Sequence, residues 1–376
     1  MVHPLQTEGV TYVIQRAQSM MAMFQMVALY AVARSHASRA RLVWQAIAVL
    51  CLAMALDCKP HLVAMPLVVL LYERIFQGGP WSAWLRRGWP LYAGMGWLWL
   101  FNVGHMASLF HTMDIGSHGA LPVAGGSQTM TSTEYAQSEF AVIIHYLRLS
   151  VWLSGLCLDY AWPIAQSAAD IVPYALVVVT MMAAGAWALW RFPAVGFLVA
   201  WVALNLAPSS SLVPRPDLAV EHRMYVPLMG IIALVVIGGE WLRARMAPGG
   251  RLALAGLMIA AVSAYAIATI QRNQDYHSAL GMWEQVARER PGNPRAHVNA
   301  AAMLAAAGRA PEALVHYERA LALKADYPEA HNSYGNALAD LGRTGEAIAQ
   351  YRIAIRLCPT YADALNNLGT ALFDQH

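Results

Sequence analysis

Long apolar runs, each nearly free of charge, limit the fold of this chain more than any other feature. A helix of about 20 apolar residues is long enough to cross the hydrocarbon core of a bilayer. Eight segments are candidates for such spans: 10–32, 42–56, 61–77, 89–110, 171–190, 194–207, 224–242 and 252–270. Only 12% of the 376 residues are charged, about half the share that is typical of soluble domains. The sequence therefore predicts an all-α integral membrane protein with a polytopic bundle of about eight spanning helices.

Arginine clusters predict the orientation of this bundle, because short cytoplasmic loops carry an excess of positive charge. The clusters lie at 34–41, 74–87 and 243–251. Eight spans with an exported amino terminus place all three in the cytoplasm, provided that the stretch 139–158 lies in the interface or re-enters without crossing. The loop 208–223 and everything after residue 270 are then expected on the exported side. The net charge of +3 is too small to indicate nucleic acid as a partner.

The segment Pro208–Pro227, PSSSLVPRPDLAVEHRMYVP, is the densest polar stretch between apolar runs. Each proline removes a backbone donor, and lipid offers no replacement partner, so the segment is expected at a membrane face. Its charged run is Glu221, His222 and Arg223. Charges beside a spanning helix are costly unless they pair or meet a charged ligand, which makes them a candidate functional site. The alternative is a solvated loop from which Arg223 extends to water.

Other charged residues are expected at the same face. The basic ones are Arg16, Lys59, His222 and Arg223, and the acidic ones are Glu8, Asp57 and Glu221. The basic side chains could together neutralise a phosphate, since arginine offers two parallel donors and lysine a point charge. The acids could equally pair with them in a structural ion network that binds no ligand. The four cysteines form no CxxC pair, so the sequence indicates neither a metal site nor a disulfide framework.

Beyond residue 270 the composition changes, and positions recur thirty-four residues apart. Gly308 recurs as Gly342 and Tyr317 as Tyr351. This period is that of tetratricopeptide repeats (TPR), pairs of antiparallel helices that stack into a solenoid. We predict a membrane domain at 1–270 and a repeat domain at 271–376. The repeat domain divides into a half repeat at 274–291, repeats at 294–327 and 328–361, and a partial repeat at 362–376.

A short solenoid of this kind suits an extended peptide or a partner protein. Its histidines, His297, His316 and His331, lack the spacing of four residues along a helix that a metal site would favour. We interpret them as surface or packing residues.

Four motifs in order carry a resemblance to a known family. They are HPLQTEGVTYVIQR at 3–16, LDCKPHLVAMPLVVLLYE at 56–73, LAPSSSLVPRPDLAVEHRMYVPLMG at 206–230, and QRNQDYHSALGMWEQV at 271–286, which the repeats follow. Together they resemble the TPR-containing membrane glycosyltransferases of the GT-C type, which include the transmembrane and TPR-containing protein O-mannosyltransferases and their bacterial relatives. The resemblance implies transfer of a sugar from a polyprenyl-phosphate carrier to a protein acceptor, commonly a Ser or Thr hydroxyl, on the exported face. It places the carrier phosphate near Arg223, His222, Lys59, Arg16 and Tyr225, and it implies no further cofactor.

The family has one feature that this chain does not show. Family members begin with a further span and a first exported loop with paired acidic residues, which are thought to act as the base or to hold the acceptor. This chain begins after that point, so we expect an incomplete enzyme and assign no catalytic residue. Asp114, Glu134 and Glu139 lie on the expected side, but their spacing does not mark a catalytic pair. The alternative is a non-catalytic, membrane-anchored TPR scaffold. Either protein is expected in a bacterial inner membrane, with its repeats in the periplasm.

Overall fold

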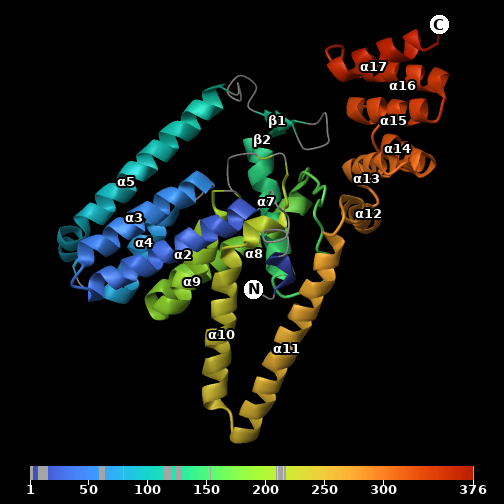
Figure 1. Cartoon of the computed structure of the whole chain (residues 1–376). Coiled ribbons are helices and arrows are strands. Elements are labelled where there is room, and N and C mark those ends of the chain that lie inside the picture. Colours follow the sequence, from blue (N-terminus) through green and yellow to red (C-terminus); the bar gives the residue numbers. More distant parts are fainter. Residues whose placement is uncertain are drawn as a thin grey trace. The chain divides into compact units, whose positions relative to one another are not determined.

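The computed structural model describes residues 3–6, 16–58, 64–78, 80–112, 120–122, 129–152, 154–208, 210, 215 and 217–375. The chain divides into two compact units (Figure 1). The membrane unit comprises Met1–Leu121, Met130–Leu156 and Pro163–Arg272. The repeat unit comprises Pro122–Thr129, Cys157–Trp162 and Asn273–His376.

Helices make up almost all of the described membrane unit, as the sequence predicts. In chain order they are η1 (Pro4–Gln6), α2 (Arg16–Ala37), α3 (Arg41–Cys58), α4 (Met65–Tyr72), the π-helical turn η4 (Glu73–Gln77), α5 (Trp81–Thr112), α7 (Ser132–Leu149), α8 (Ala168–Arg191), α9 (Pro193–Leu206), η5 (Glu221–Met224), α10 (Pro227–Arg245) and α11 (Pro248–Asp275). Two short strands, β1 (Ala120–Pro122) and β2 (Thr129–Thr131), form a two-stranded sheet.

Four helices among the described residues are long and apolar enough to cross a membrane: α3, α8, α10 and α11. A fifth apolar helix, α9, has 14 residues. The other expected spans coincide with α2, with α4 and η4, and with α5, although 10–15 and 61–63 lie outside the described residues. The structure thus supports a membrane protein with four candidate spans, and eight spans remain a prediction.

The helix α7 occupies part of the stretch that was expected in the interface. It starts at a capping box, in which the Glu134 backbone N–H donates to Thr131 Oγ1 (3.2 Å) and the Thr131 N–H donates to Glu134 Oε2 (2.8 Å). Such reciprocal bonds satisfy backbone donors that the first turn leaves open. The helix ends at Leu149, earlier than expected, and the described residues of 150–167 form turns and irregular backbone. Of the acids in the preceding loop, Glu134 therefore has a structural role.

The core of the membrane unit contains many small side chains where α2 packs on α3. Ala28, Ala31, Ala48 and Ala55 are fully buried. Small side chains allow helix backbones to approach closely, and this favours association in lipid, where apolar burial alone gives little driving force.

The repeat unit is a series of short antiparallel helices (Figure 1). They are α12 (Ala279–Glu289), α13 (Pro294–Ala306), α14 (Ala310–Leu323), α15 (Pro328–Asp340), α16 (Thr344–Leu357) and α17 (Ala362–Phe373). Gly308 and Gly342 occupy equivalent turns with φ of 76° and 73°, a conformation that glycine adopts without steric cost. Tyr317 and Tyr351, also equivalent, are buried between the helices. The recurring residues of the sequence are thus the turn and packing residues of the solenoid.

A short segment from the middle of the chain, Cys157–Trp162, packs with these repeats. Asp159 Oδ2 lies 2.6 Å from Arg295 Nε at the start of α13, and Arg290 lies over the ring of Tyr160. Nothing in the sequence period predicts this addition, because the segment belongs to no repeat.

Candidate functional site

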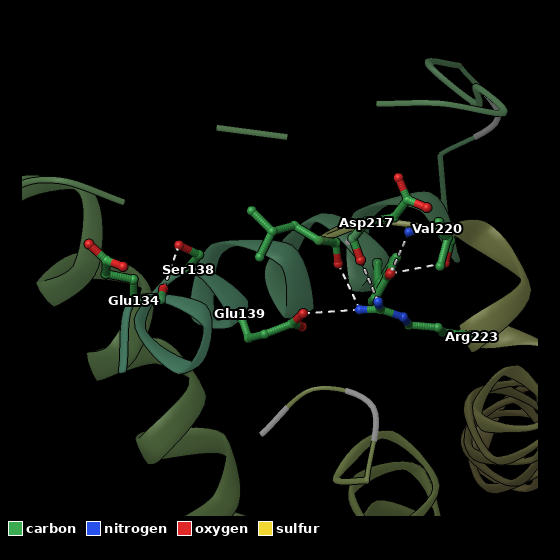
Figure 2. A network of polar contacts seen from close by, with 8 residues as sticks. Glu134, Ser138, Glu139, Asp217, Val220 and Arg223 are labelled. Carbon is green, nitrogen blue, oxygen red and sulfur yellow. Dashed lines mark hydrogen bonds and ion pairs between the residues drawn. The ribbon is translucent and has the colours of Figure 1, made fainter. Parts of the chain in front are cut away.

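Buried charges of the membrane unit meet where α7 faces the segment that leads into η5. Arg223 Nη1 donates to Glu139 Oε1 at 3.0 Å, and the two side chains are 5% and 2% exposed. Figure 2 shows the Arg223 side chain reaching from its own segment toward the carboxylate of Glu139 on α7. Burial of a charge is costly, so it requires a close partner of opposite sign. We call the buried residues Glu139, Glu221, Arg223 and Arg272, together with the half-buried Arg215, the buried-charge cluster.

Backbone carbonyls complete the surroundings of the Arg223 guanidinium. Nη1 donates to the carbonyl oxygen of Leu218 (2.7 Å), and Nη2 donates to that of Asp217 (2.6 Å). The same segment is tied to α7 a second time, because Tyr146 Oη donates to the carbonyl of Val220 (2.9 Å) and accepts from its N–H (2.8 Å). These bonds connect residues 217–223 to α7.

A second ion pair lies in the same part of the membrane unit. Arg272 Nη2 lies 2.7 Å from Glu221 Oε2, and the side chains are 8% and 0% exposed. Glu221 begins η5, and Arg272 lies near the end of α11, so the pair joins parts of the chain about fifty residues apart. Removal of either partner would leave a buried charge without compensation.

The electrostatics of the buried-charge cluster follow from its burial and its composition. Burial raises the pKa of the Glu139 carboxyl, and the Arg223 charge offsets part of that shift. Burial opposes the charge of Arg223, but Tyr146, Tyr135 and Glu139 around it raise the pKa of its guanidinium above the ordinary value. The pKa of Arg215 is lowered, first by burial and then by the nearby Arg223.

The five members of the cluster are three arginines and two glutamates, and a further acid, Asp217, lies beside Arg223, which donates to its carbonyl. Two glutamates pair with two arginines, and Arg215 has no ion pair among the described residues. Arg223 opposes the charge of Arg215, and Tyr135 and Glu139 favour it. A guanidinium without an ion pair attracts an anion, and guanidinium groups bind phosphate through two parallel hydrogen bonds.

The structure brings together some of the residues that the sequence singles out. Arg223 and Glu221 belong to the cluster, and each forms an ion pair with a residue from a distant part of the chain, Glu139 and Arg272 respectively. His222 is half-buried in η5. Tyr225 is buried, and its carbonyl accepts a hydrogen bond from Gln6 Nε2 at 3.3 Å.

The remaining predicted residues do not join the cluster in the described part of the chain. Asp57 is exposed near the end of α3. Glu8 and Lys59 lie outside the described residues, and Arg16 begins α2 with a side chain that also lies outside them. Their role in phosphate binding stays a prediction.

Sequence reasoning missed three members of the cluster: Glu139, Arg215 and Arg272. The sequence suggested Glu139 only as a possible base, and its partner lies 84 residues away along the chain. Arg272 carried one usable signal, because it is a lone charge at the end of a long apolar run. Among the described residues, no three or more His, Cys, Asp or Glu side chains come together as metal ligands.

Comparison with known proteins identifies the repeats and one distant relative. The family model for the TPR repeat matches residues 301–342 and 335–375, which confirms the predicted repeat type. Protein O-mannosyl-transferase TMTC1 of Mus musculus is 25% identical over 221 residues, which cover 54% of this chain and 24% of that protein. The match thus spans about a quarter of the relative's length.

A solved structure shares similarity with part of the chain. The crystal structure of a thermophilic TPR protein of Thermus thermophilus aligns at 22% identity, with a TM-score of 0.26, over 52% of this chain and 98% of that one. The chain therefore carries TPR repeats and, over about half of its length, is similar to a protein O-mannosyl-transferase.

Proposed function

We propose that the membrane unit is a glycosyltransferase of the GT-C type that moves a sugar from a polyprenyl-phosphate carrier to a protein acceptor. The observation that carries this proposal is the buried-charge cluster with Arg215, which has no ion pair among the described residues. An anchor without a ligand would not need buried charges, which cost free energy in an apolar protein. The printed name of the mouse relative supports the same reaction class.

The carrier phosphate is the anion that we assign to the cluster. When the acceptor hydroxyl attacks the anomeric carbon, a new carbon–oxygen bond forms and the bond to the carrier phosphate breaks. The phosphate leaves with the electron pair, and the hydroxyl proton passes to a base. Arg215 and Arg223 stabilise the charge on the departing phosphate, and Glu139 holds Arg223 in position.

The TPR repeats present the acceptor in this proposal. Stacked helix pairs form an extended surface for a peptide or a folded partner. We place the functional surfaces of both units on the exported face, because the arginine distribution of the sequence predicts this orientation.

The test measures binding of a polyprenyl-phosphate mannose carrier to the full chain in lipid nanodiscs, and then transfer of the sugar to a Ser/Thr-containing peptide. Arg215→Gln should lower carrier binding about tenfold, because it removes a charge-assisted contact and leaves both ion pairs intact. Arg215→Lys should recover part of the binding, since it restores the charge without the planar donors. Arg245→Gln, at an exposed position on α10, is the matched control and should bind as the unchanged protein does. Equal binding by all four proteins would reject the proposal.

A second candidate function is a membrane-anchored TPR scaffold. The observation that favours it is that the Arg223 guanidinium already contacts Glu139 and two backbone carbonyls, as a structural arginine does. A scaffold would bind its partner proteins with full affinity in the Arg215→Gln variant, and it would show no dependence on a lipid-linked sugar.

A further inference from the structure

A cavity of about 570 Å³ opens in the membrane unit between the end of α2, the start of α3 and the first turns of α5. It lies outside the buried-charge cluster and contains none of its residues. Its volume is in the range of sites for small organic ligands, roughly 300–1,000 Å³. Arg39, Arg41 and Arg87 line it, together with Ser35, His36 and Ser38. We call it the arginine pocket.

The three arginines of this pocket carry charge that the described part of the protein does not neutralise. Each is exposed, and none has a hydrogen bond or ion pair through its side chain among the described residues. The described lining contains no acidic side chain. The nearby Glu73 is buried, and its carboxylate pairs with Nε2 of the lining residue His36 at 3.0 Å and accepts a hydrogen bond from Tyr92 Oη, so it contacts none of the three arginines.

Apolar side chains form another part of the same lining. Leu42 and Val43 line the pocket and are 61% and 58% exposed. Both lie in the first turn of α3, which is a candidate membrane span that begins at Arg41. The pocket is therefore at the end of a span, where headgroups and acyl chains meet. Trp44 in the next position stacks under Arg34, with 5.8 Å to the ring centroid, and tryptophan is enriched at this depth.

We propose that the arginine pocket binds the phosphate of an anionic phospholipid, whose acyl chains lie along Leu42 and Val43. Three guanidinium groups supply the charge and the paired donors that a phosphodiester accepts. A free phosphate compound has the same negative charge, but it has no acyl chain to contact the apolar part of the lining. The loop between α2 and α3 is arginine-rich, as is expected at the cytoplasmic membrane face, where anionic lipids attract basic segments.

The test uses the full chain in mixed detergent micelles, with native mass spectrometry to count bound lipid. The probes are phosphatidylglycerol, phosphatidylcholine and glycerol 3-phosphate. Phosphatidylglycerol should bind in preference to phosphatidylcholine, and Arg87→Gln should weaken its binding about tenfold. Arg86→Gln is the matched control, because the neighbouring Arg86 donates to the carbonyl of Ser82 and does not line the pocket. It should leave the binding unchanged.

A further variant separates the two sources of phosphate. Leu42→Asn with Val43→Thr removes apolar contact without changing charge, so it should weaken phosphatidylglycerol binding and leave glycerol 3-phosphate binding unaffected. Arg87→Lys, which keeps the charge, should recover part of the lost lipid binding if the Arg87→Gln protein is folded. Equal losses in Arg86→Gln and Arg87→Gln would overturn the proposal, because they would show a diffuse surface charge. Glycerol 3-phosphate binding as tightly as the lipid would overturn the lipid as the ligand.

Discussion

Glu221 and Arg272 form an ion pair of 2.7 Å that is almost completely buried in the membrane unit. Arg272 is the last residue of that unit, and the repeat unit continues the chain at Asn273. The pair thus fixes the end of α11 to η5, the short helix that also carries Arg223. One buried contact connects the last candidate span with the segment to which we assign the carrier phosphate.

Loss of one partner of this pair should destabilise the membrane unit. Arg272→Ala leaves the buried Glu221 without its counter-charge, and we expect a loss of about 3–5 kcal/mol in the free energy of unfolding. The double variant Glu221→Leu with Arg272→Met removes both charges and should recover most of it. Thermal unfolding of the full chain in detergent measures the stability of the single and the double variant. A double variant as unstable as Arg272→Ala would contradict a role for the pair's charges.

Replacement of Arg223 tests the predicted phosphate contact. Arg223→Ala should weaken carrier binding about tenfold or more, and Arg223→Lys should recover part of it, because lysine keeps the charge but not the two parallel donors. Binding of a polyprenyl phosphate is measured together with thermal stability, since Arg223→Ala also leaves Glu139 unpaired. Unchanged carrier binding in a folded Arg223→Ala protein would assign Arg223 a structural role only.

The repeat unit should lose stability in mild acid because of His297. Its Nε2–H donates to the carbonyl of Pro291 (3.1 Å), and its Nδ1 lies 3.2 Å from His316 Nδ1. Burial lowers the pKa of His297, and the neighbouring His316 and Arg319 lower it further, while the Pro291 carbonyl opposes them. The unfolded chain therefore binds more protons than the folded one once the pH falls below about 6.5, and folding weakens from there through the lower folded pKa.

Unfolding of the full chain at about pH 7.5 and at about pH 5.5, followed by hydrogen exchange in α13, measures this effect. His297→Gln should reduce the pH dependence. The next repeat provides a natural control. Its equivalent histidine, His331, has the uncharged Gln350 where His297 has His316, with Nδ1 and Oε1 at 2.7 Å. His316→Gln copies that arrangement and should also reduce the dependence. A steeper dependence in either variant would contradict the mechanism.

Two equivalent glycines of the repeats should respond differently to alanine. A methyl group at Gly335 would lie 2.5 Å from the ring of Tyr351, so Gly335→Ala should cost about 1–3 kcal/mol through overpacking. A methyl group at Gly369, thirty-four residues later, meets no atom within 4 Å. Gly369→Ala should therefore be neutral or stabilise α17 slightly, because alanine favours a helix over glycine. Chemical denaturation of the full chain compares the free energies of unfolding of the two variants. Equal losses of stability would contradict this account of the packing.

Cysteine labelling tests the predicted orientation. In a background without the native cysteines, Arg343→Cys in the repeat unit should react with an impermeant reagent added to intact cells. Arg39→Cys in the loop between α2 and α3 should react only after permeabilisation, because arginine-rich loops are retained in the cytoplasm. The reverse pattern would overturn the orientation.

The repeat unit illustrates how much local sequence can determine. Its turns need glycine at Gly308 and Gly342, and its helix pairs need large side chains such as Tyr317 and Tyr351 at fixed intervals. Contacts between neighbouring repeats lie close together in sequence, so a period is enough to predict them. The membrane character of the first unit was equally accessible, because apolar length decides which helices can cross a bilayer.

The partners of the buried charges, in contrast, were decided by the tertiary structure. The sequence marks Arg223 and Glu221 as unusual but does not indicate their partners, and the fold gives them Glu139 and Arg272. These contacts depend on how α7, η5 and α11 approach one another. The pattern of apolar residues along a helix cannot predict such a contact. An ion pair between distant segments constrains only two side chains and leaves the rest of each helix unchanged. The sequence alone therefore determined the types of the two units and the importance of the polar segment, and the fold decided which charges neutralise one another and gave Arg215 no ion pair among the described residues.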